Sequence, residues 1–377
     1  MSKRGKNEGT IRKRSDGRWE GRVMLGYRNG KRVRPSFYAK SRGEVQQSIG
    51  KAIRDFQQGL PAAPERQSVK NFLERWLEET ARPRLRRRTF DGYQQHVRKH
   101  IEPCLGHVPL HQLTPQNVQK MIKTQSDVGL SPRTVRYTRA VLRTALNQAL
   151  KWNLVARNAA ALVDVPRSTR HEIRVLDPEE SRGLLKAAEA SRLGALFSVA
   201  LAVGLRLGEA LALGWADVDL DKKALRVRRA LQRIDKKLQF VEPKSERSRR
   251  AVNIPQFAVS ALKRHAIRQK KERLLAGGRW RESGLVFTST IGTPLDERNV
   301  RREFRAILKA AKLPPMRIHD LWHTCASLLL AQGVHARVVM EVLGHSQISL
   351  TMDTYSHVSP ALHGEAAQKM DSLLAQK

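Results

Sequence analysis

The 377-residue sequence is poor in cysteine, in acidic residues and in long apolar runs, and each shortage excludes a class of protein. Only Cys104 and Cys325 occur, far apart and outside any spacing typical of metal ligands, so neither a disulfide framework nor a zinc site is expected. The longest uncharged apolar run, 193–205, is too short to span a bilayer. No apolar segment follows the basic first residues, so no signal peptide is predicted.

Basic residues are abundant and evenly spread. The chain has 71 Lys and Arg against 35 Asp and Glu, a net charge of +36. Residues 1–60 carry +11, residues 61–171 carry +12, and the remainder carries +13. A uniformly basic chain predicts a polyanionic partner bound along its whole length, whereas charge needed only for solubility would not require this sign or size. We therefore expect a nucleic acid partner, no membrane association, and a location in the cytoplasm on the nucleoid.

Residues 9–58 have the pattern of three short strands followed by a helix. Turn signals at 15–17 and 29–30 separate segments in which apolar and charged residues alternate. A capping signal at 41–44 precedes apolar residues at helical spacing. The predicted sheet is rich in arginine, which favours DNA binding over a minor structural appendage. The arginines of this sheet expected to contact DNA are Arg12, Arg14, Arg22 and Arg32.

The pattern from residue 68 to about 160 is entirely helical. Thr114-Pro115 and Ser131-Pro132 each place a capping hydroxyl before a first-turn proline, so each predicts a helix start. Breaks near 59–65 and 165–170 divide the chain into three predicted domains, 1–60, 66–164 and 172–377. A cluster at the start of one middle helix is expected to contact DNA phosphates, although a solvated helix face is the alternative. The cluster consists of Arg86, Arg87 and Arg88.

The last domain reads as helices interrupted by short strands between 223 and 252. It contains residue types that suit cleavage of a phosphodiester without a metal. Cations offset charge on the non-bridging oxygens, imidazoles donate hydrogen bonds or protons, and a phenol attacks phosphorus. The residues are Arg206, Lys244, His319, His345 and Tyr355.

The surroundings of these residues predict further roles. Arg206 follows Gly204 at a break between two apolar runs, so it should stand at a helix start, with Glu209 as a buttress. Lys244 should lie at the end of a β-hairpin formed by 238–241 and 251–254. Arg249 and Arg250, on the same hairpin, are expected to contact the DNA backbone.

The order of these motifs closely resembles the tyrosine recombinase (phage integrase) family, whose pattern is Arg, Lys, His-x-x-Arg, His/Trp and Tyr. The resemblance implies a mainly α, mixed fold. Its parts are a three-stranded sheet with a helix that binds arm-type DNA sites, a four-helix core-binding domain, and a mainly helical catalytic domain with a small sheet. It also implies a homo-tetramer on two double-stranded DNA duplexes with specific attachment sites, assisted by directionality or DNA-bending proteins.

The resemblance further implies the reaction, site-specific cutting and rejoining of DNA for integration and excision of a mobile element. Tyr355 would form a 3′-phosphotyrosine, which a 5′-hydroxyl of the partner duplex then reverses. Lys244 would protonate the leaving 5′-oxygen, and Arg206, His319 and His345 would bind the scissile phosphate. No metal and no nucleotide cofactor is required by such a scheme.

One position departs from the family pattern. Trp322 stands where the family places its second arginine, and an indole offers one neutral N–H in place of a charged, two-pronged guanidinium. Losing one donor from a site of this kind typically costs about 10²–10³ in rate. We therefore hypothesise that the chain binds DNA and assembles normally but cleaves poorly or not at all.

Two other functions compete with an active recombinase. The first is a non-catalytic DNA-binding protein that keeps the recombinase fold, which Trp322 makes plausible. The second is a metallohydrolase, because His319 and His323 with Asp320 between them mimic the zincin motif His-Glu-x-x-His. The second alternative has no clear third ligand and leaves the basic charge unexplained.

Overall fold

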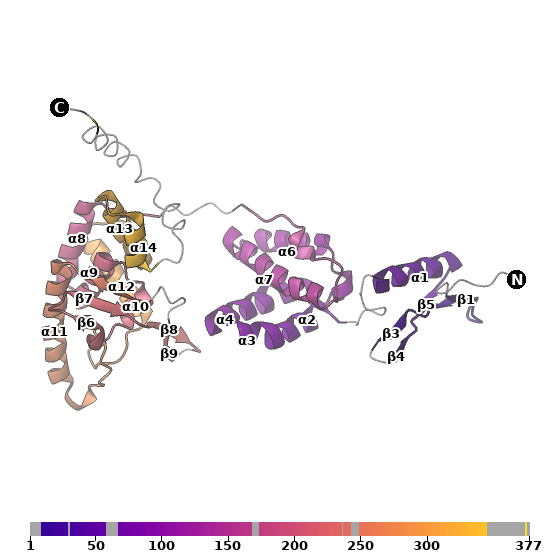
Figure 1. The fold of residues 1–377 in the computed structure, drawn as a ribbon, viewed down its shortest axis with the longest axis horizontal. Helices are drawn as coiled ribbons and strands as arrows, with labels where there is room; N and C mark the ends of the chain where they lie inside the picture. Colours follow the sequence, from indigo (N-terminus) through magenta and orange to yellow (C-terminus); the bar gives the residue numbers. More distant parts are fainter. Residues whose placement is uncertain are drawn as a thin grey trace. The chain divides into compact units, whose positions relative to one another are not determined.

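The computed structural model describes residues 9–28, 31–57, 67–167, 173–235, 237–242, 249–344 and 374. The chain divides into two compact units, Met1–Arg170 and His171–Lys377, whose elements are labelled in Figure 1. None of the helices in the described ranges combines the length and the apolarity that crossing a lipid bilayer demands.

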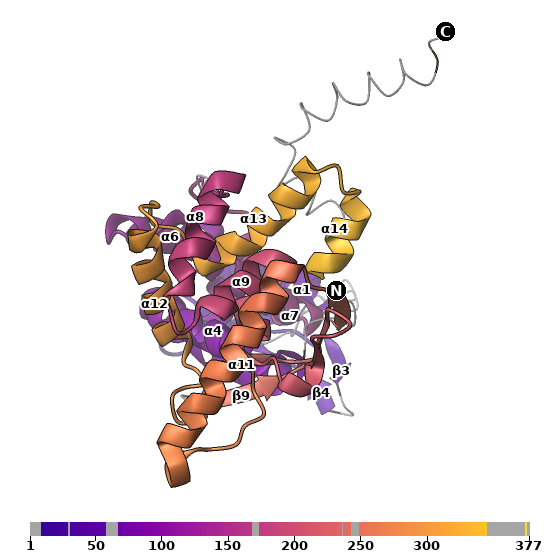
Figure 2. The ribbon, with the colours of Figure 1, turned by 90° about the vertical axis from the view of Figure 1, so that its left-hand side faces the viewer.

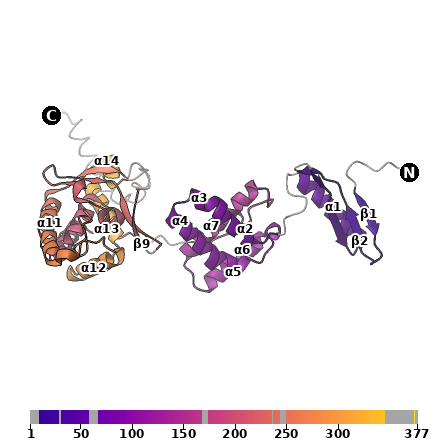
Figure 3. The ribbon, with the colours of Figure 1, turned by 90° about the horizontal axis from the view of Figure 1, so that it is seen from below.

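The first unit begins with two small sheets and a helix. Strands β1 (Thr10–Lys13), β2 (Trp19–Arg22) and β5 (Ser36–Ala39) form an antiparallel sheet in the order β1-β2-β5. Helix α1 (Arg42–Gln57) packs along one face of it (Figure 3). Strand β2 can lie close to this helix because residue 21 is a glycine. A Cβ at this position would be only 2.3 Å from Val45 Cγ1, which is too close for two carbon atoms. The predicted three strands and helix are confirmed.

A second hairpin lies on either side of the predicted turn at 29–30, but its strands form a separate sheet, so the pattern of three strands becomes five. Strand β3 (Gly26–Arg28) pairs with β4 (Lys31–Val33) in antiparallel fashion, with Arg28 opposite Lys31. The predicted turn residues 29–30 lie outside the described residues. Gly17, in the other predicted turn, has φ of +80°, a conformation that glycine adopts at little cost.

The remainder of the first unit is a helical bundle. Two long helices each contain a short π-helical stretch. The first consists of α2 (Val69–Trp76), the π-helical η1 (Leu77–Ala81) and α3 (Arg82–Arg84). The second consists of α4 (Arg87–His96), the π-helical η2 (Val97–Ile101) and α5 (Glu102–Leu105). A 3₁₀ turn (Leu110–Gln112), α6 (Pro115–Asp127), α7 (Pro132–Lys151) and a second 3₁₀ turn (Ala159–Ala161) follow.

Both predicted helix starts in the bundle are confirmed. The Thr114 hydroxyl accepts a hydrogen bond from the backbone N–H of Asn117, and the Ser131 hydroxyl accepts one from that of Thr134. The helices enclose one apolar core that includes Phe72, Trp76 and Leu142. The expected helical bundle is therefore present, built from four main helical segments in the described part of the unit.

The described residues of the second unit are mainly helical and include two small sheets. Its helices are α8 (Pro178–Glu189), α9 (Gly194–Val203), α10 (Leu207–Leu211), α11 (Gln256–Ala276), α12 (Glu297–Ala310), α13 (Ile318–Ala331) and α14 (Ala336–Leu343). Two 3₁₀ turns span Trp215–Asp217 and Gly277–Arg279. The apolar helix α9 lies at the centre, packed against α8, α11 and α13 (Figure 2).

The strands of this unit pair differently from the prediction. Strand β10 (Arg250–Asn253) pairs with β7 (Ala224–Val227), which also pairs with β6 (Val218–Asp219). Strand β9 (Lys237–Val241) pairs with β8 (Ala230–Ile234). The predicted hairpin between 238–241 and 251–254 is wrong, because its two strands belong to different sheets.

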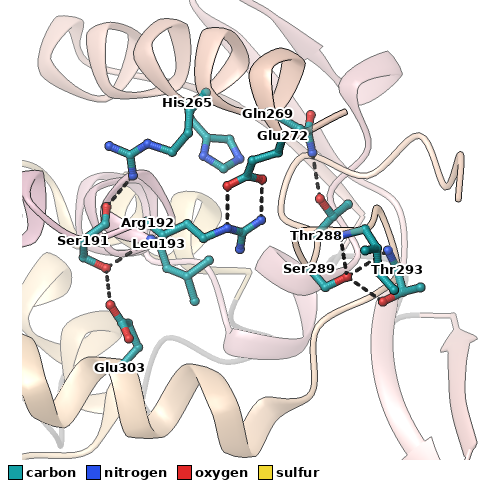
Figure 4. Close-up of polar contacts among 12 residues, drawn as sticks. Ser191, Arg192, Leu193, His265, Gln269, Glu272, Thr288, Ser289, Thr293 and Glu303 are labelled. Carbon is teal, nitrogen blue, oxygen red and sulfur yellow. Dashed lines mark hydrogen bonds and ion pairs between the residues drawn. The ribbon is translucent and has the colours of Figure 1, made fainter. Parts of the chain in front are cut away.

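A buried polar network holds α11 against the rest of the unit (Figure 4). The Arg192 guanidinium donates two hydrogen bonds of 2.6 Å to the Glu272 carboxylate. The Gln269 amide donates to Thr288 Oγ1 at 3.0 Å, and the Ser191 hydroxyl donates to Glu303 at 2.7 Å. Burial lowers the pKa of His265, whose ring contacts the Val286 carbonyl. These hydrogen bonds stabilise the scaffold of the unit, although His265 Nδ1 is buried without a hydrogen-bond partner among the described residues.

Candidate active site

Arg206 stands directly before helix α10, as predicted. Helix α9 ends at Gly204, whose φ of +60° reverses the chain. A Cβ on Gly204 would lie 2.3 Å from Leu343 Cδ2, so the close approach of the two segments also favours glycine. Arg206 has an extended backbone, and its side chain is 36% exposed. The guanidinium is therefore anchored on a rigid turn yet remains accessible to a ligand.

Glu209 holds Arg206 from behind. Its buried carboxylate accepts hydrogen bonds from the Arg206 backbone N–H at 3.2 Å and from Arg206 Nη1 at 2.9 Å. Arg206 Nη2 donates to the carbonyl of Gly344 at 3.3 Å. The contact expected of a buttress is thus present, and the Arg206 side chain remains partly exposed.

His319 and Trp322 lie on the same face of α13, three residues apart. Their rings stack with centroids 5.1 Å apart and planes inclined by 13°. Arg206 Cζ lies over the Trp322 ring, 5.7 Å from its centroid, which is within cation–π range. Partial burial and the neighbouring charge of Arg206 lower the pKa of His319. The imidazole is therefore mostly neutral at pH 7 and can donate one hydrogen bond.

Trp322 is also part of the protein core. Its side chain is only 4% exposed and packs with Cys325, Ala326 and Leu343, among others. Burial raises the pKa of the Cys325 thiol to about 12, so this cysteine is inert at neutral pH. The indole of Trp322 therefore fills space in the protein core, and it also stands where the family pattern has an arginine.

His323 completes the aromatic cluster. Its ring meets Trp322 at 85° and His319 at 77°, both edge to face. The intervening Asp320 accepts hydrogen bonds from the backbone N–H and the Nη2 of Arg317, both at 2.7 Å. Over the described ranges, three or more His, Cys, Asp or Glu residues nowhere gather in a way that could hold a metal ion. The His319–His323 pair thus belongs to a stacked cluster with Trp322.

Arg250 lies inside the protein, in contrast to the predicted contact with the DNA backbone. Its side chain is 6% exposed, and its Nη2 donates to Glu209 Oε2 at 3.1 Å. A side chain so enclosed offers little surface to a phosphate, and the contact of Arg250 with DNA stays a prediction. The neighbouring Arg249 is 56% exposed and pairs with Glu242, which is compatible with the predicted contact.

Three predicted catalytic residues lie outside the described residues: Lys244, His345 and Tyr355. Lys244 falls between β9 and β10, and His345 directly follows Gly344, whose φ of +66° ends helix α14 as the sequence predicted. Of the predicted catalytic set, the described residues therefore bring together Arg206, His319 and Trp322, with Glu209 in support.

Comparisons with known proteins match this arrangement to one family. Residues 174–361 match the phage integrase family, and residues 68–125 match the N-terminal SAM-like domain of phage integrases. A tyrosine recombinase XerC-like protein of Caldanaerobacter subterraneus subsp. tengcongensis is 30% identical over 364 residues, covering 92% of this chain and 93% of the relative. An integrase of Saccharopolyspora erythraea is 30% identical over 419 residues, covering 96% of each.

The chain belongs to the phage integrase family. Members of this family are tyrosine recombinases, which break and rejoin DNA strands. The Tn1549 transposon integrase in complex with transposon right end DNA has a TM-score of 0.70 at 18% identity, over 82% of this chain and 100% of that one. A lambda integrase tetramer bound to a Holliday junction has a TM-score of 0.57 at 19% identity, over 93% and 96%. These likenesses confirm the predicted fold class.

The integrase has an arginine-lined recess beside His319 that the sequence interpretation missed. Its volume is about 610 Å³, and Leu207, Phe304 and Met316 are among the residues that line it. Its arginines are Arg174, Arg301, Arg305 and Arg317. The i, i+4 spacing of the two arginines on α12 was a usable signal, because that spacing places side chains on one helix face.

On the N-terminal sheet, three of the four predicted DNA-contacting arginines share one face. Glu20, only 1% exposed, accepts hydrogen bonds from Arg12 and Arg22, each at 2.7 Å. Arg14 lies over the Tyr38 ring, and the Tyr38 hydroxyl donates to Glu20 at 3.3 Å. The fourth predicted residue is Arg32 on β4, whose Nε donates to the Tyr27 hydroxyl at 3.2 Å.

The predicted cluster in the bundle lies at the start of α4 and is exposed. Arg86 precedes the helix, and Arg87 forms an ion pair of 3.0 Å with Asp91. Arg88 is exposed in the first turn. The geometry is compatible with phosphate contacts, and equally with the solvated helix face that was the alternative.

Proposed function

We propose that this integrase binds specific attachment sites on double-stranded DNA and that Tyr355 cleaves them, with Trp322 limiting the cleavage rate. The observation that carries the proposal is the contact of Trp322 with both Arg206 and His319. The family's second arginine would stand at this point. The site thus keeps one phosphate-binding arginine and one histidine around an uncharged indole.

The chemistry follows from the charges. Attack by the Tyr355 oxygen forms a bond to phosphorus, and the bond to the 5′-oxygen breaks. The phenol, with a pKa of about 10 in water, gives up its proton, and Lys244 supplies one to the leaving oxygen. Arg206 offsets the negative charge on the non-bridging oxygens, while neutral His319 and His345 donate hydrogen bonds. A 5′-hydroxyl then reverses the same steps on the partner strand.

Trp322 weakens this scheme in two ways. The indole adds no formal charge where a guanidinium would bind two phosphate oxygens. It also fills space beside two of the proposed phosphate ligands, Arg206 and His319, and only 4% of its surface is exposed. A DNA-binding protein with the recombinase fold and little or no cleavage is therefore the second candidate function, favoured by the same observation.

The DNA-binding surface that we propose has three parts. The first part is the face of the N-terminal sheet with Arg12, Arg14 and Arg22, to which we add Arg32 on β4. The second part is the start of α4, with Arg86, Arg87 and Arg88. The third part is the recess beside His319, to which we add the exposed Arg249. Each part lies in one of three proposed domains, 1–60, 66–164 and 172–377. By analogy with the family, four protomers would act on two duplexes in the cytoplasm at the nucleoid, with accessory directionality or bending proteins.

Trapping the covalent intermediate tests the proposal. The substrate is a nicked duplex that carries the attachment site, whose sequence is taken from the paired repeats that flank the inserted element. After cleavage the short strand next to the nick is lost, so the protein remains linked to the DNA. Protein with Trp322→Arg should become linked to this DNA, and the further change Tyr355→Phe should abolish the link without altering DNA affinity. Tyr137→Phe is the matched control. DNA cut by water with no attached protein would overturn the proposal.

A further inference from the structure

Arg250 is a buried cation at a junction of three segments. It is the first residue of β10, the strand that follows the segment with Lys244. Its Nε donates to the carbonyl of Val342 at 2.6 Å, and its Nη2 lies 3.5 Å from the carbonyl of Gly204. These carbonyls belong to the C-terminal ends of α14 and α9, where a positive charge is favourable.

The same guanidinium shares Glu209 with Arg206. Glu209 Oε1 accepts from Arg206 Nη1, and Glu209 Oε2 accepts from Arg250 Nη2 and from the Arg206 backbone N–H. A carboxylate with both oxygens engaged has little freedom to rotate. Arg250 therefore fixes the orientation of Glu209, and Glu209 in turn fixes the direction in which Arg206 points.

Both arginines also contact the turn that precedes His345. Arg206 Nη2 donates to the Gly344 carbonyl, and a Cβ on Gly344 would be 2.9 Å from Arg250 Nη1. Glycine is thus required at position 344 for space as well as for its φ of +66°. Arg250 lies against the backbone at the point where the chain leaves α14.

We propose that Arg250 is a positioning residue that holds Arg206 and the turn before His345 in one arrangement. It does so from the strand that follows the Lys244 segment, so it links the elements that carry three of the proposed phosphate-handling residues. The inference rests on the proposed roles of those residues. It assigns Arg250 no contact with DNA, because the side chain is enclosed.

The experiment compares Arg250→Gln with Arg250→Lys in the full chain carrying Trp322→Arg. Covalent adduct formation on the nicked duplex, DNA affinity and the unfolding temperature are measured for each. Arg250→Gln should slow adduct formation on the order of 100-fold at unchanged affinity, as expected for a misplaced catalytic group. Arg250→Lys should restore part of the rate, because it returns the charge but not the planar fork.

Arg192→Gln is the control, since it removes an ion pair of the same unit that is partly buried, less so than that of Arg250, and lies away from the site. It should lower the unfolding temperature without slowing adduct formation of the folded protein. Equal adduct rates for Arg250→Gln and Arg192→Gln would overturn the inference. Loss of folding in both Arg250 variants would overturn it as well, by assigning Arg250 to the fold alone.

A second readout does not depend on cleavage. Because the charge of Arg206 lowers the pKa of His319, a displaced Arg206 should let that pKa rise. Histidine NMR titration of the chain with Trp322 should therefore show a higher His319 pKa in Arg250→Gln than in Arg192→Gln. If the pKa rises but no adduct ever forms with Trp322→Arg, the proposed function fails while the positioning role stands. An unchanged pKa would refute the positioning role.

Discussion

The imidazole of His319 lies flat against the indole of Trp322, with ring centroids 5.1 Å apart. Trp322 also contacts the guanidinium of Arg206, whose Cζ lies over the ring. A single side chain therefore touches both phosphate ligands that the structure describes. Any change at position 322 acts on charge, on packing and on the orientation of its two neighbours together.

Replacing Trp322 with arginine should raise the rate of covalent adduct formation about 10²–10³-fold. The substitution restores a charge beside the scissile phosphate. It should also lower the free energy of unfolding by about 2–4 kcal/mol, because a packed indole leaves the core. Single-turnover trapping and denaturant unfolding measure the two effects. Gln332→Arg, an exposed change that also adds one charge, controls for stronger non-specific binding. Equal adduct rates for Trp322→Arg and the unaltered protein would refute the hypothesis of impaired cleavage.

Removing the charge of Arg206 should raise the pKa of His319. In the folded protein this pKa is lowered first by partial burial, then by the charge of Arg206 and less by that of Arg317, so Arg206→Met removes the larger of the two charge effects. The pKa of His319 is lower in the folded protein than the value of about 6.5 in the unfolded chain. Protonation of His319 at low pH therefore favours the unfolded state. Stability should therefore fall as the pH drops below about 6.5, and by less in Arg206→Met. NMR titration checks the pKa, and a value unchanged by the substitution would contradict the electrostatic account.

Glu20→Gln should weaken binding of the N-terminal sheet to its DNA sites. The carboxylate holds Arg12 and Arg22 in fixed positions on one face, and an amide cannot pair with both. Hydrogen bonds from Arg12, and then from Arg22, lower the pKa of Glu20. Its contribution to folding is therefore present above the unfolded pKa of about 4.3 and is lost as the pH falls through the lower folded pKa. Fluorescence anisotropy with specific and scrambled duplexes measures the effect. Glu44→Gln, on α1, is the control, and equal affinities for the two variants would remove Glu20 from this role.

Arg305→Ala should weaken DNA binding about equally for all sequences. Arg305 lines the recess beside His319, and a phosphate contact there would carry no sequence information. Loss of one such contact should reduce the slope of log K against log salt concentration by about 0.9. The exposed Arg302 lies on the same helix but does not line the recess, so Arg302→Ala is the control. Identical slopes for both variants would exclude the recess from the DNA interface.

Local signals in the sequence predicted much of the fold. Proline and hydroxyl pairs marked the starts of α6 and α7, and Gly204 and Gly344 marked the ends of α9 and α14, because these residues act on their own backbone. Strand pairing was predicted less well. Strands β9 and β10 are close in sequence but belong to different sheets, since the partner of a strand depends on contacts far along the chain.

Residue types and their order, by themselves, determined the family, the basic charge and the departure at Trp322, because these properties depend on which side chains are present and not on how they pack. Only the tertiary structure decided that Arg249 is exposed while Arg250 is enclosed beside Glu209. Arg249 precedes β10 and Arg250 is its first residue, and Arg250 is enclosed because Val342 of α14 and Glu209 of α10, supplied by distant parts of the chain, contact it. The stacking of His319, Trp322 and Arg206 was decided in the same way, by the packing of α13 against the turn after α9.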